Sequence, residues 1–126
     1  MKRTPAVAVV AAALLLASYP LRAHHGQAAY DMTKPVTVNG TVTEFQFANP
    51  HCIVLFEVKD AGGATQQWQG ELTSPNRLVR AGWTSRSIKA ADHVTLTGWR
   101  AKSGAPSLYI TKTFVNGQEL KLAAGS

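Results

Sequence analysis

The sequence of 126 residues contains a single cysteine, Cys52, so it cannot form an intramolecular disulfide. It also contains no Cys-x-x-Cys motif, no glycine-rich phosphate-binding loop and no paired carboxylates. Its serines, histidines and Asp92 have no spacing that favours a catalytic triad. His51 and Cys52 are adjacent in a predicted strand, where consecutive side chains point to opposite faces, so they are not a nucleophile and base pair. These absences argue against a hydrolase or a transferase.

Long apolar runs are also missing. The longest, from Ala6 to Ala17, has about a dozen residues and is too short to span a bilayer. It follows the basic pair Lys2-Arg3 and is followed by Ala23, which is the order of an export signal with its small residue at the cleavage site. We therefore expect an exported protein, periplasmic or secreted, whose mature chain begins at His24. Because no cysteine follows the cleavage site and no other segment could span a bilayer, we expect no membrane anchor after cleavage.

Acidic residues are few, with 7 against 13 basic residues and a net charge of +6. Loss of Lys2, Arg3 and Arg22 with the signal would lower the basic residues to 10 and the net charge to +3. This excess is scattered along the chain, so nucleic acid is not an expected partner. The remaining 103 residues suffice for one small domain with a modest core. The expected organisation is a signal peptide (1–23), an N-terminal arm (24–35) and a barrel domain (36–126).

The mature sequence does have the alternating apolar pattern of β-strands. Apolar side chains occupy even positions from Val36 to Val42 but odd positions at Phe45 and Phe47. A regular strand cannot change parity in this way, so we expect a bulge between Gly40 and Phe45. Further strands are expected at 51–59, 65–72, 94–98 and 108–115.

The pair Ser74-Pro75 predicts a short helix over 76–81, with serine as the N-cap and proline at the first helical position. Gly82 is well placed to end that helix. Three strands, a short helix and two more strands follow the order of an OB-fold barrel. We therefore expect an all-β fold with one short helix, a small five-stranded OB-fold-like barrel, with a β-sandwich as the alternative. Cys52, in an apolar strand, is expected to be a buried thiol.

Histidines are the most informative residues of the mature chain. An N-terminal histidine such as His24 can chelate a metal through its ring and its α-amine, whose ordinary pKa is roughly 7.7–8.0. His25 follows it, and His51 is expected at the rim of the barrel after a proline turn. Such an all-nitrogen ligand set favours Cu(II), then Ni(II) or Zn(II). The alternative is that the N-terminal pair is solvated and that His51 hydrogen-bonds the backbone of a turn. The fourth histidine, His93, is expected at the surface.

Glu71, on the polar face of the third predicted strand, has two interpretations. It could form an ion pair with Arg77 or Arg80 of the helix, which is the simpler one, or it could orient a metal-binding histidine. If the chain binds no metal, the face around Asn76, Arg80 and Trp83 is the expected binding surface.

Five short motifs run along nearly all of the mature chain: Ala23-His24-His25, Gly40-Thr41-Val42, Asn49-Pro50-His51, the segment from Trp68 to Asn76, and Gly82-Trp83. In this combination the chain resembles a family of small exported bacterial proteins of unknown function. The resemblance implies an exported β-barrel-like domain and places His24, His25 and His51 among the motif positions of the family. It implies no activity. The chain departs from the pattern at Gln46, where the family often has an acidic residue.

These observations predict a non-enzymatic, exported binding domain that holds a transition metal, copper first, for carriage, buffering or delivery to a periplasmic protein partner. The alternative is a metal-free OB-like module that binds a protein or a small ligand. A copper oxidase that activates oxygen at an N-terminal histidine is a third hypothesis, which the small surface available to a substrate disfavours.

Overall fold

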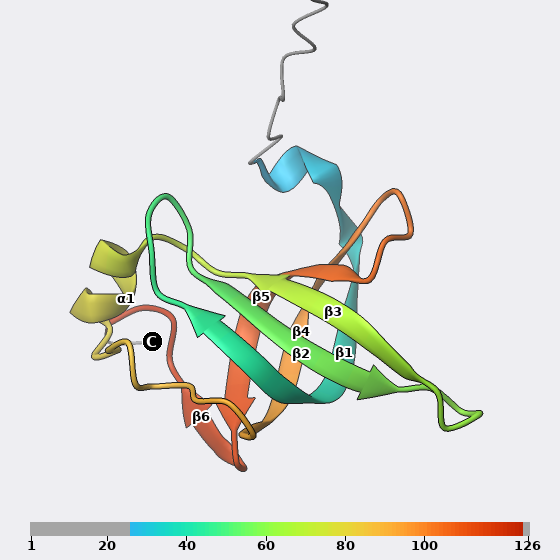
Figure 1. Ribbon diagram of the computed structural model, residues 1–126. Coiled ribbons are helices and arrows are strands. Elements are labelled where there is room, and N and C mark those ends of the chain that lie inside the picture. Colours follow the sequence, from blue (N-terminus) through green and yellow to red (C-terminus); the bar gives the residue numbers. More distant parts are fainter. Residues whose placement is uncertain (1–25, 125–126) are drawn as a thin grey trace, which may run out of the picture.

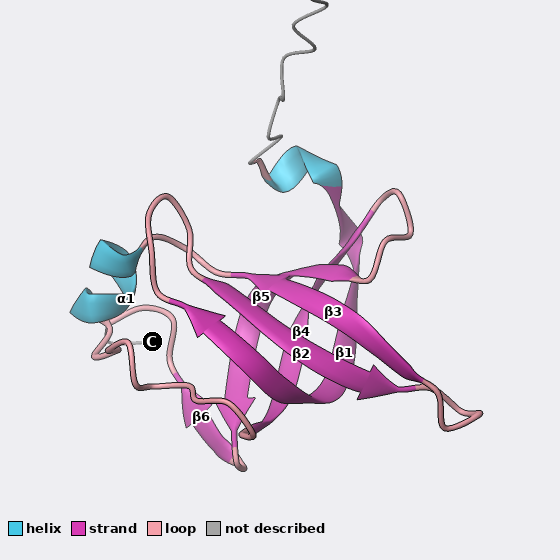
Figure 2. Cartoon of the chain, in the orientation of Figure 1, coloured by secondary structure: helices cyan, strands magenta, loops and turns pink. Residues whose placement is uncertain are grey.

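The computed structural model describes residues 26–124, so the predicted signal peptide, His24 and His25 lie outside the described residues. Its elements, in chain order, are η1 (Gln27–Ala29), β1 (Tyr30–Gln46), β2 (Ile53–Lys59), β3 (Thr65–Glu71), α1 (Pro75–Arg80), β4 (His93–Ala101), β5 (Ser107–Val115) and β6 (Gln118–Leu120) (Figure 1). Strands dominate, as Figure 2 shows. Within residues 26–124, neither helical element is long and apolar enough to cross a membrane.

The strands form one sheet that closes on itself. Its order is β3-β2-β1-β4-β5-β6, and a parallel pairing between β3 and β5 joins the sheet into a barrel. Five strands make the closed barrel, β6 is an additional strand at the edge of β5, and α1 lies between β3 and β4 in the chain. The predicted small OB-like barrel with one short helix is therefore confirmed.

The long first strand carries the predicted bulge. Its pairing with β2 shifts register between Val42 and Glu44, and the apolar side chains change parity there. At Gly40 the two strands approach so closely that a Cβ atom would lie 2.6 Å from the carbonyl oxygen of Glu57. A glycine at this position allows this close approach of β1 to β2 where β1 bends around the barrel.

The first strand also starts earlier than the apolar pattern suggests. It begins at Tyr30, which pairs with Ala101, and Pro35 pairs with Trp99 of β4. The side chains from Met32 to Pro35 are exposed, so this part of the strand has no apolar alternation to reveal it. Much of the segment expected as an arm is thus part of the sheet.

The barrel interior is apolar. Its buried core includes Val42, Cys52, Val54, Phe56, Trp68, Leu72, Leu78, Trp83, Ile88, Val94, Leu96, Leu108, Ile110 and Val115. Cys52 is a buried thiol, as predicted, and burial raises its pKa. Trp83 also belongs to the core, because only 3% of it is exposed and its Nε1 donates to the carbonyl of Lys121 at 2.7 Å.

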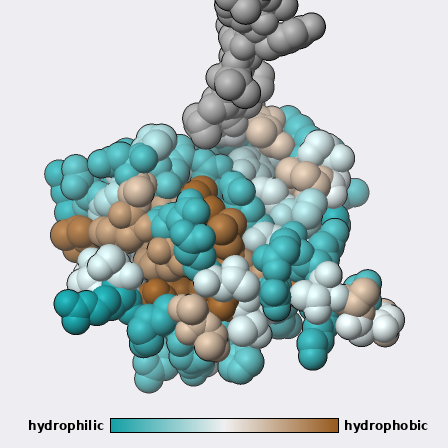
Figure 3. All heavy atoms as spheres, in the orientation of Figure 1, coloured by the Kyte–Doolittle hydropathy of each residue, from teal (hydrophilic) through white to brown (hydrophobic). Residues whose placement is uncertain are grey.

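The α-helix of the described residues, α1, is short and covers one end of the barrel. Leu78 points into the core, whereas Val79 is 55% exposed. Ser74 is at the predicted N-cap position, but its side chain makes no capping hydrogen bond. Gly82 ends the helix as predicted, with φ +95° in the left-handed region. On the face shown in Figure 3, apolar atoms gather in the half around α1, and the half over β3 is mostly hydrophilic.

Candidate functional site

The last residue of β3, Glu71, is a buried carboxylate on the outside of the barrel. Side chains alternate along a strand, so Gly70 and Leu72 face the interior and Glu71 faces outward. It lies at the seam of the barrel, where its Cα partner in the parallel pairing is Tyr109 of β5. Only 6% of Glu71 is exposed. An acid buried to this extent needs hydrogen-bond donors for its oxygens.

The first donor is His51, in the loop that joins β1 to β2. Two backbone hydrogen bonds hold this loop against the end of β3: from the Cys52 N–H to the Thr73 carbonyl at 3.0 Å, and from the Leu72 N–H to the Cys52 carbonyl at 2.8 Å. As a result, the Nδ1 atom of His51 lies 2.5 Å from Oε1 of Glu71. His51 lies at a rim, as predicted, and Glu71 contacts a histidine, which was the second of its two interpretations.

The second donor is Tyr30, the first residue of β1. Its hydroxyl donates to Oε2 of Glu71 at 2.6 Å, although 41 residues separate the two in the chain. Only 7% of Tyr30 is exposed. Burial raises its pKa to about 12, and the hydrogen bond to the carboxylate of Glu71 acts in the same direction. Tyr30 is therefore a neutral phenol at all physiological pH values, and its O–H group donates a hydrogen bond to Glu71.

The two contacts assign the proton on the histidine ring. When Glu71 is ionised it can only accept hydrogen bonds, so Nδ1 of His51 must carry the hydrogen that lies between them. In a neutral ring the lone pair is then on Nε2. A carboxylate that accepts from one ring nitrogen and thereby orients the other is the arrangement found behind metal-bound histidines.

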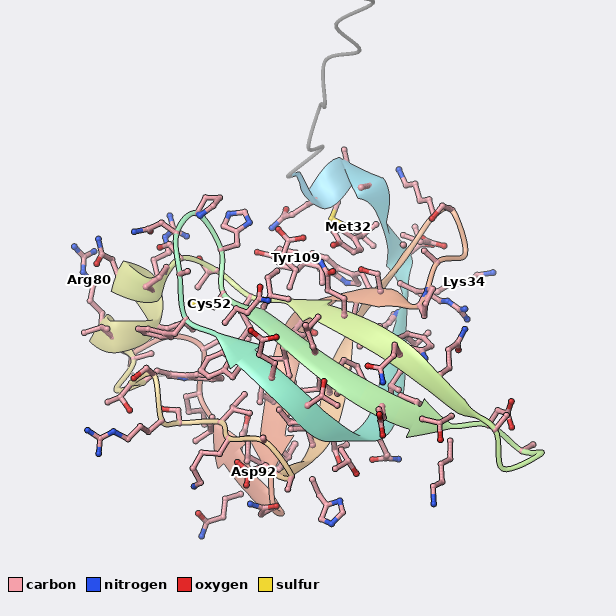
Figure 4. All side chains as sticks on the ribbon, viewed as in Figure 1. Met32, Lys34, Cys52, Arg80, Asp92 and Tyr109 are labelled. Atoms are coloured by element: carbon pink, nitrogen blue, oxygen red, sulfur yellow. The ribbon has the colours of Figure 1, made fainter. Side chains whose placement is uncertain are left out.

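The ring of Tyr30 packs against a second aromatic ring, which stacks on a third. The Tyr30 ring lies 5.7 Å from that of Tyr109, measured between centroids. Tyr109 in turn stacks on Trp99 of β4, with centroids 5.5 Å apart and an angle of 13° between the planes. Figure 4 shows Tyr109 at the upper edge of the barrel, below the N-terminal segment. The packed rings restrict the movement of the phenol that holds Glu71.

A cavity of about 350 Å³ opens beside the His51–Glu71 pair. Its lining comes from the loop before β2, the end of β3 and the residues after it, α1, β5 and the start of the described chain: Gly26, Gln27, His51, Glu71, Thr73, Ser74, Arg77 and Tyr109. The beginning of the described chain thus reaches the same cavity as the predicted metal-binding histidine at the rim.

The other predicted site residues lie elsewhere. Asn76 and Arg80 are exposed on α1 and do not line this cavity, and Trp83 lies in the core. Among residues 26–124, neither Arg77 nor Arg80 forms an ion pair with Glu71, so the simpler interpretation of Glu71 is wrong. The loop before β2 folds back and brings His51 to the carboxylate instead.

The sequence did not reveal Tyr30 or Tyr109 as site residues. Tyr30 is an isolated aromatic residue in a segment without periodicity, and its burial depends on pairing with a strand about seventy positions later. The described part of the chain, residues 26–124, contains no group of three or more His, Cys, Asp or Glu side chains placed to hold a metal. His51 alone could therefore not form a closed metal site with those residues.

Comparison with known proteins gives a family and little else. A model described as a family of unknown function (DUF6152) matches residues 11–108, well over half of the chain. No protein with a curated description matches. One solved structure that matches is described as the ZRD-deleted mutant of TiaS in complex with agmatine, with 17% identity and a TM-score of 0.41. That match covers 74% of this chain and 23% of the other, so this chain spans about a quarter of that protein's length. A similarity at this level carries no argument about function.

Proposed function

The chain belongs to this family of unknown function, and we propose that it is a non-enzymatic, exported domain that binds a transition metal, copper first. In this proposal His51 supplies a ring nitrogen, His24 supplies its α-amine and ring, and His25 supplies a further ligand or supports one. The role would be metal carriage, buffering or delivery to a periplasmic protein partner.

The contact between His51 and Glu71 carries the proposal. Nδ1 lies 2.5 Å from the carboxylate, so this contact orients the ring, and in a neutral ring that donates through Nδ1 the lone pair is on Nε2. The side chain of His51 is 32% exposed and that of Glu71 is 8% exposed. A metal bound to Nε2 could therefore reach solvent or a partner protein, whereas the orienting carboxylate would remain protected from water.

The course of the chain supports the second part of the site. Gly26 and Gln27 line the same cavity as His51, and His24 and His25 directly precede Gly26 in the sequence. An extended residue spans at most about 3.6 Å, and His24 and His25 lie within two residues of this lining. Since residues 26–124 hold no group of three metal-ligating side chains, the additional ligands would have to come from this N-terminal pair.

The chemistry of the proposed ligands favours copper. An amine and two or three imidazoles form an all-nitrogen set, and for nitrogen ligands the affinity of divalent metals is greatest for Cu(II). Ni(II) and Zn(II) would bind the same atoms more weakly. The only cysteine, Cys52, is fully buried in the core and could not contribute a thiolate.

The test is a Cu(II) titration of the mature protein against a competing chelator, after mass spectrometry has shown that the chain starts at His24. We expect one copper per chain, with a loss of affinity of at least tenfold in His51→Ala. His93→Ala is the matched control, because His93 is exposed and its ring contacts Thr41 on β1. Equal affinities of the wild type and the His51→Ala variant would contradict the proposal.

The contribution of the α-amine is tested separately. A protein with Gly-Ser-Gly added before His24 keeps every side chain but loses the chelate between the amine and the adjacent ring, and it has no histidine among its first three residues that could form a new copper chelate with the amine. We expect its Cu(II) affinity to fall by at least tenfold, and a variant with the same three residues added after Ser126 to bind as the wild type does. If the N-terminal extension leaves the affinity unchanged, the amine is not a ligand.

A further inference from the structure

A second cavity, of about 510 Å³, lies between α1, β5 and the C-terminal segment. One wall is cationic, with Arg77 and Arg80 from the helix, and another is apolar, with Leu122, Ala123 and Ala124 of the C-terminal segment. The volume falls in the range of cavities that hold small organic molecules. Apolar surface with a few polar groups on one side is also the usual composition of such sites.

Among the described residues, the cationic wall has no acidic counterpart. None of the residues that line this cavity is an aspartate or a glutamate. The ion pairs among residues 26–124 join His51 to Glu71 and Lys121 to Glu119, so neither arginine takes part in one. The two arginines are three positions apart on α1, which places their side chains on the same face of the helix. A negatively charged ligand would therefore meet two guanidinium groups.

We propose that this cavity binds an unbranched organic carboxylate of medium chain length. A guanidinium group presents a planar fork of N–H donors that matches the two oxygens of a carboxylate. The hydrocarbon chain would lie against Leu122 and the neighbouring alanines, where it leaves water. An inorganic anion would satisfy the arginines but leave the apolar wall uncovered, and a neutral hydrocarbon would do the reverse.

This site is separate from the proposed metal site, although the two are neighbours. The cavities share Thr73, Arg77 and Tyr109, so Arg77 stands at the boundary between them. The carboxylate site uses no histidine and does not require copper. Its test is therefore carried out in the presence of a metal chelator, and its result is independent of whether the metal site exists.

The first experiment is a calorimetric and ¹H–¹⁵N NMR titration of the mature protein with octanoate, and with octanamide as the uncharged control. We expect one octanoate per chain, shifts confined to α1, β5 and the segment that follows Leu120, and at least tenfold weaker binding of octanamide. The proposal is overturned if octanoate does not bind, if the amide binds equally well, or if the shifts lie elsewhere.

Variants then identify the wall that recognises the charge. We expect Arg77→Gln and Arg80→Gln each to weaken octanoate binding at least fivefold, and Ala124→Glu to abolish it by adding a carboxylate beside the arginines. Arg86→Gln is the matched control, because Arg86 is an exposed arginine outside the cavity. All four positions are exposed, so the fold should tolerate the changes. Wild-type affinity in both arginine variants would refute the assignment.

Discussion

Glu71 organises the candidate site because it joins three separate parts of the chain. Its two oxygens accept hydrogen bonds from Tyr30 of β1 and from His51 of the loop before β2. An ionised carboxylate is costly to bury unless donors satisfy it, and these two contacts provide that compensation. Loss of either donor would leave part of a buried charge unsatisfied, so the three side chains should behave as one unit.

Replacement of Glu71 by glutamine tests this unit. One end of the amide is a donor, so the new side chain would face either the Tyr30 hydroxyl or the His51 N–H with a second donor. We expect Glu71→Gln to lower the free energy of unfolding by about 1–3 kcal/mol and to weaken Cu(II) binding by about 10–100-fold. Urea unfolding and chelator competition measure the two effects. Glu44→Gln, at an exposed position, is the control and should change neither.

The Tyr30 phenol gives the site a signature at high pH. Burial raises its pKa from 10.0 to about 12, so the folded protein favours the neutral phenol more than the unfolded chain does. The stability that Tyr30 contributes is therefore complete below about pH 10 and is lost as the pH rises towards 12. We expect a loss of about 2–3 kcal/mol from this group over that interval.

Urea unfolding at several pH values, together with the absorbance of tyrosinate, measures this loss. Tyr30→Phe should be less stable at neutral pH, and its stability should change less between pH 10 and 12. An identical high-pH profile in the wild type and the variant would show that the phenol of Tyr30 is not protected in the folded protein.

At the level of elements, the bend of β1 places the loop of His51 beside the end of β3. The bulge between Val42 and Glu44 redirects the strand, and close contact between β1 and β2 is possible because Gly40 has no side chain. The loop then returns along the barrel edge, where Cys52 hydrogen-bonds the backbone of Leu72 and Thr73. These backbone contacts position the loop so that His51 lies beside Glu71.

A methyl group at Gly40 should disturb this arrangement. Its Cβ would meet the backbone carbonyl of Glu57 at 2.6 Å, and a backbone atom cannot rotate out of the way. We expect Gly40→Ala to lower the free energy of unfolding by about 1–3 kcal/mol, as overpacking does. Gly62→Ala, in the turn between β2 and β3, is the control, because its nearest neighbour is the Asp60 side chain at 3.4 Å. Chemical denaturation measures both variants. Equal free energies of unfolding for Gly40→Ala and Gly62→Ala would contradict the role assigned to Gly40.

The sequence was sufficient for elements with a clear local signal. The change of apolar parity after Val42 predicted the bulge, and Ser74-Pro75 with Gly82 predicted the helix to within one residue at each end. It was insufficient for β6, Gln118–Leu120, because three residues are too few to show a period. The start of β1 at Tyr30 was also missed, because pairing with β4 rather than apolar alternation holds that segment in the sheet.

At the level of the whole molecule, barrel closure creates the site. The parallel pairing of β3 with β5 sets Glu71 beside Tyr109, and the start of β1 brings Tyr30 over both. The order of strands and helix predicted this barrel, and the rim position of His51 followed from its proline turn. The partner of Glu71 was not predicted in the same way, because the sequence favoured an arginine of α1 and the contact with His51 depends on how the loop folds back.

The cavity beside His51 and the cavity beside α1 both lie at the end of the barrel that holds Glu71, and they share Arg77 and Tyr109. The opposite end of the barrel, around His93, has another cavity, of about 470 Å³, with polar residues such as Asn39 and Lys59, but among the residues described there no buried acid holds a histidine. The proposed metal site and the proposed carboxylate site therefore lie on neighbouring surfaces at the same end of the barrel.

The most direct test of the central claim is the electron paramagnetic resonance spectrum of the mature protein with one equivalent of Cu(II). We expect a tetragonal signal with hyperfine coupling to three or four nitrogen atoms, of which one is lost in His51→Ala and none in His93→Ala. A spectrum of weakly bound, oxygen-coordinated copper, or one identical in the wild type and His51→Ala, would contradict a metal site built on the histidine that Glu71 orients.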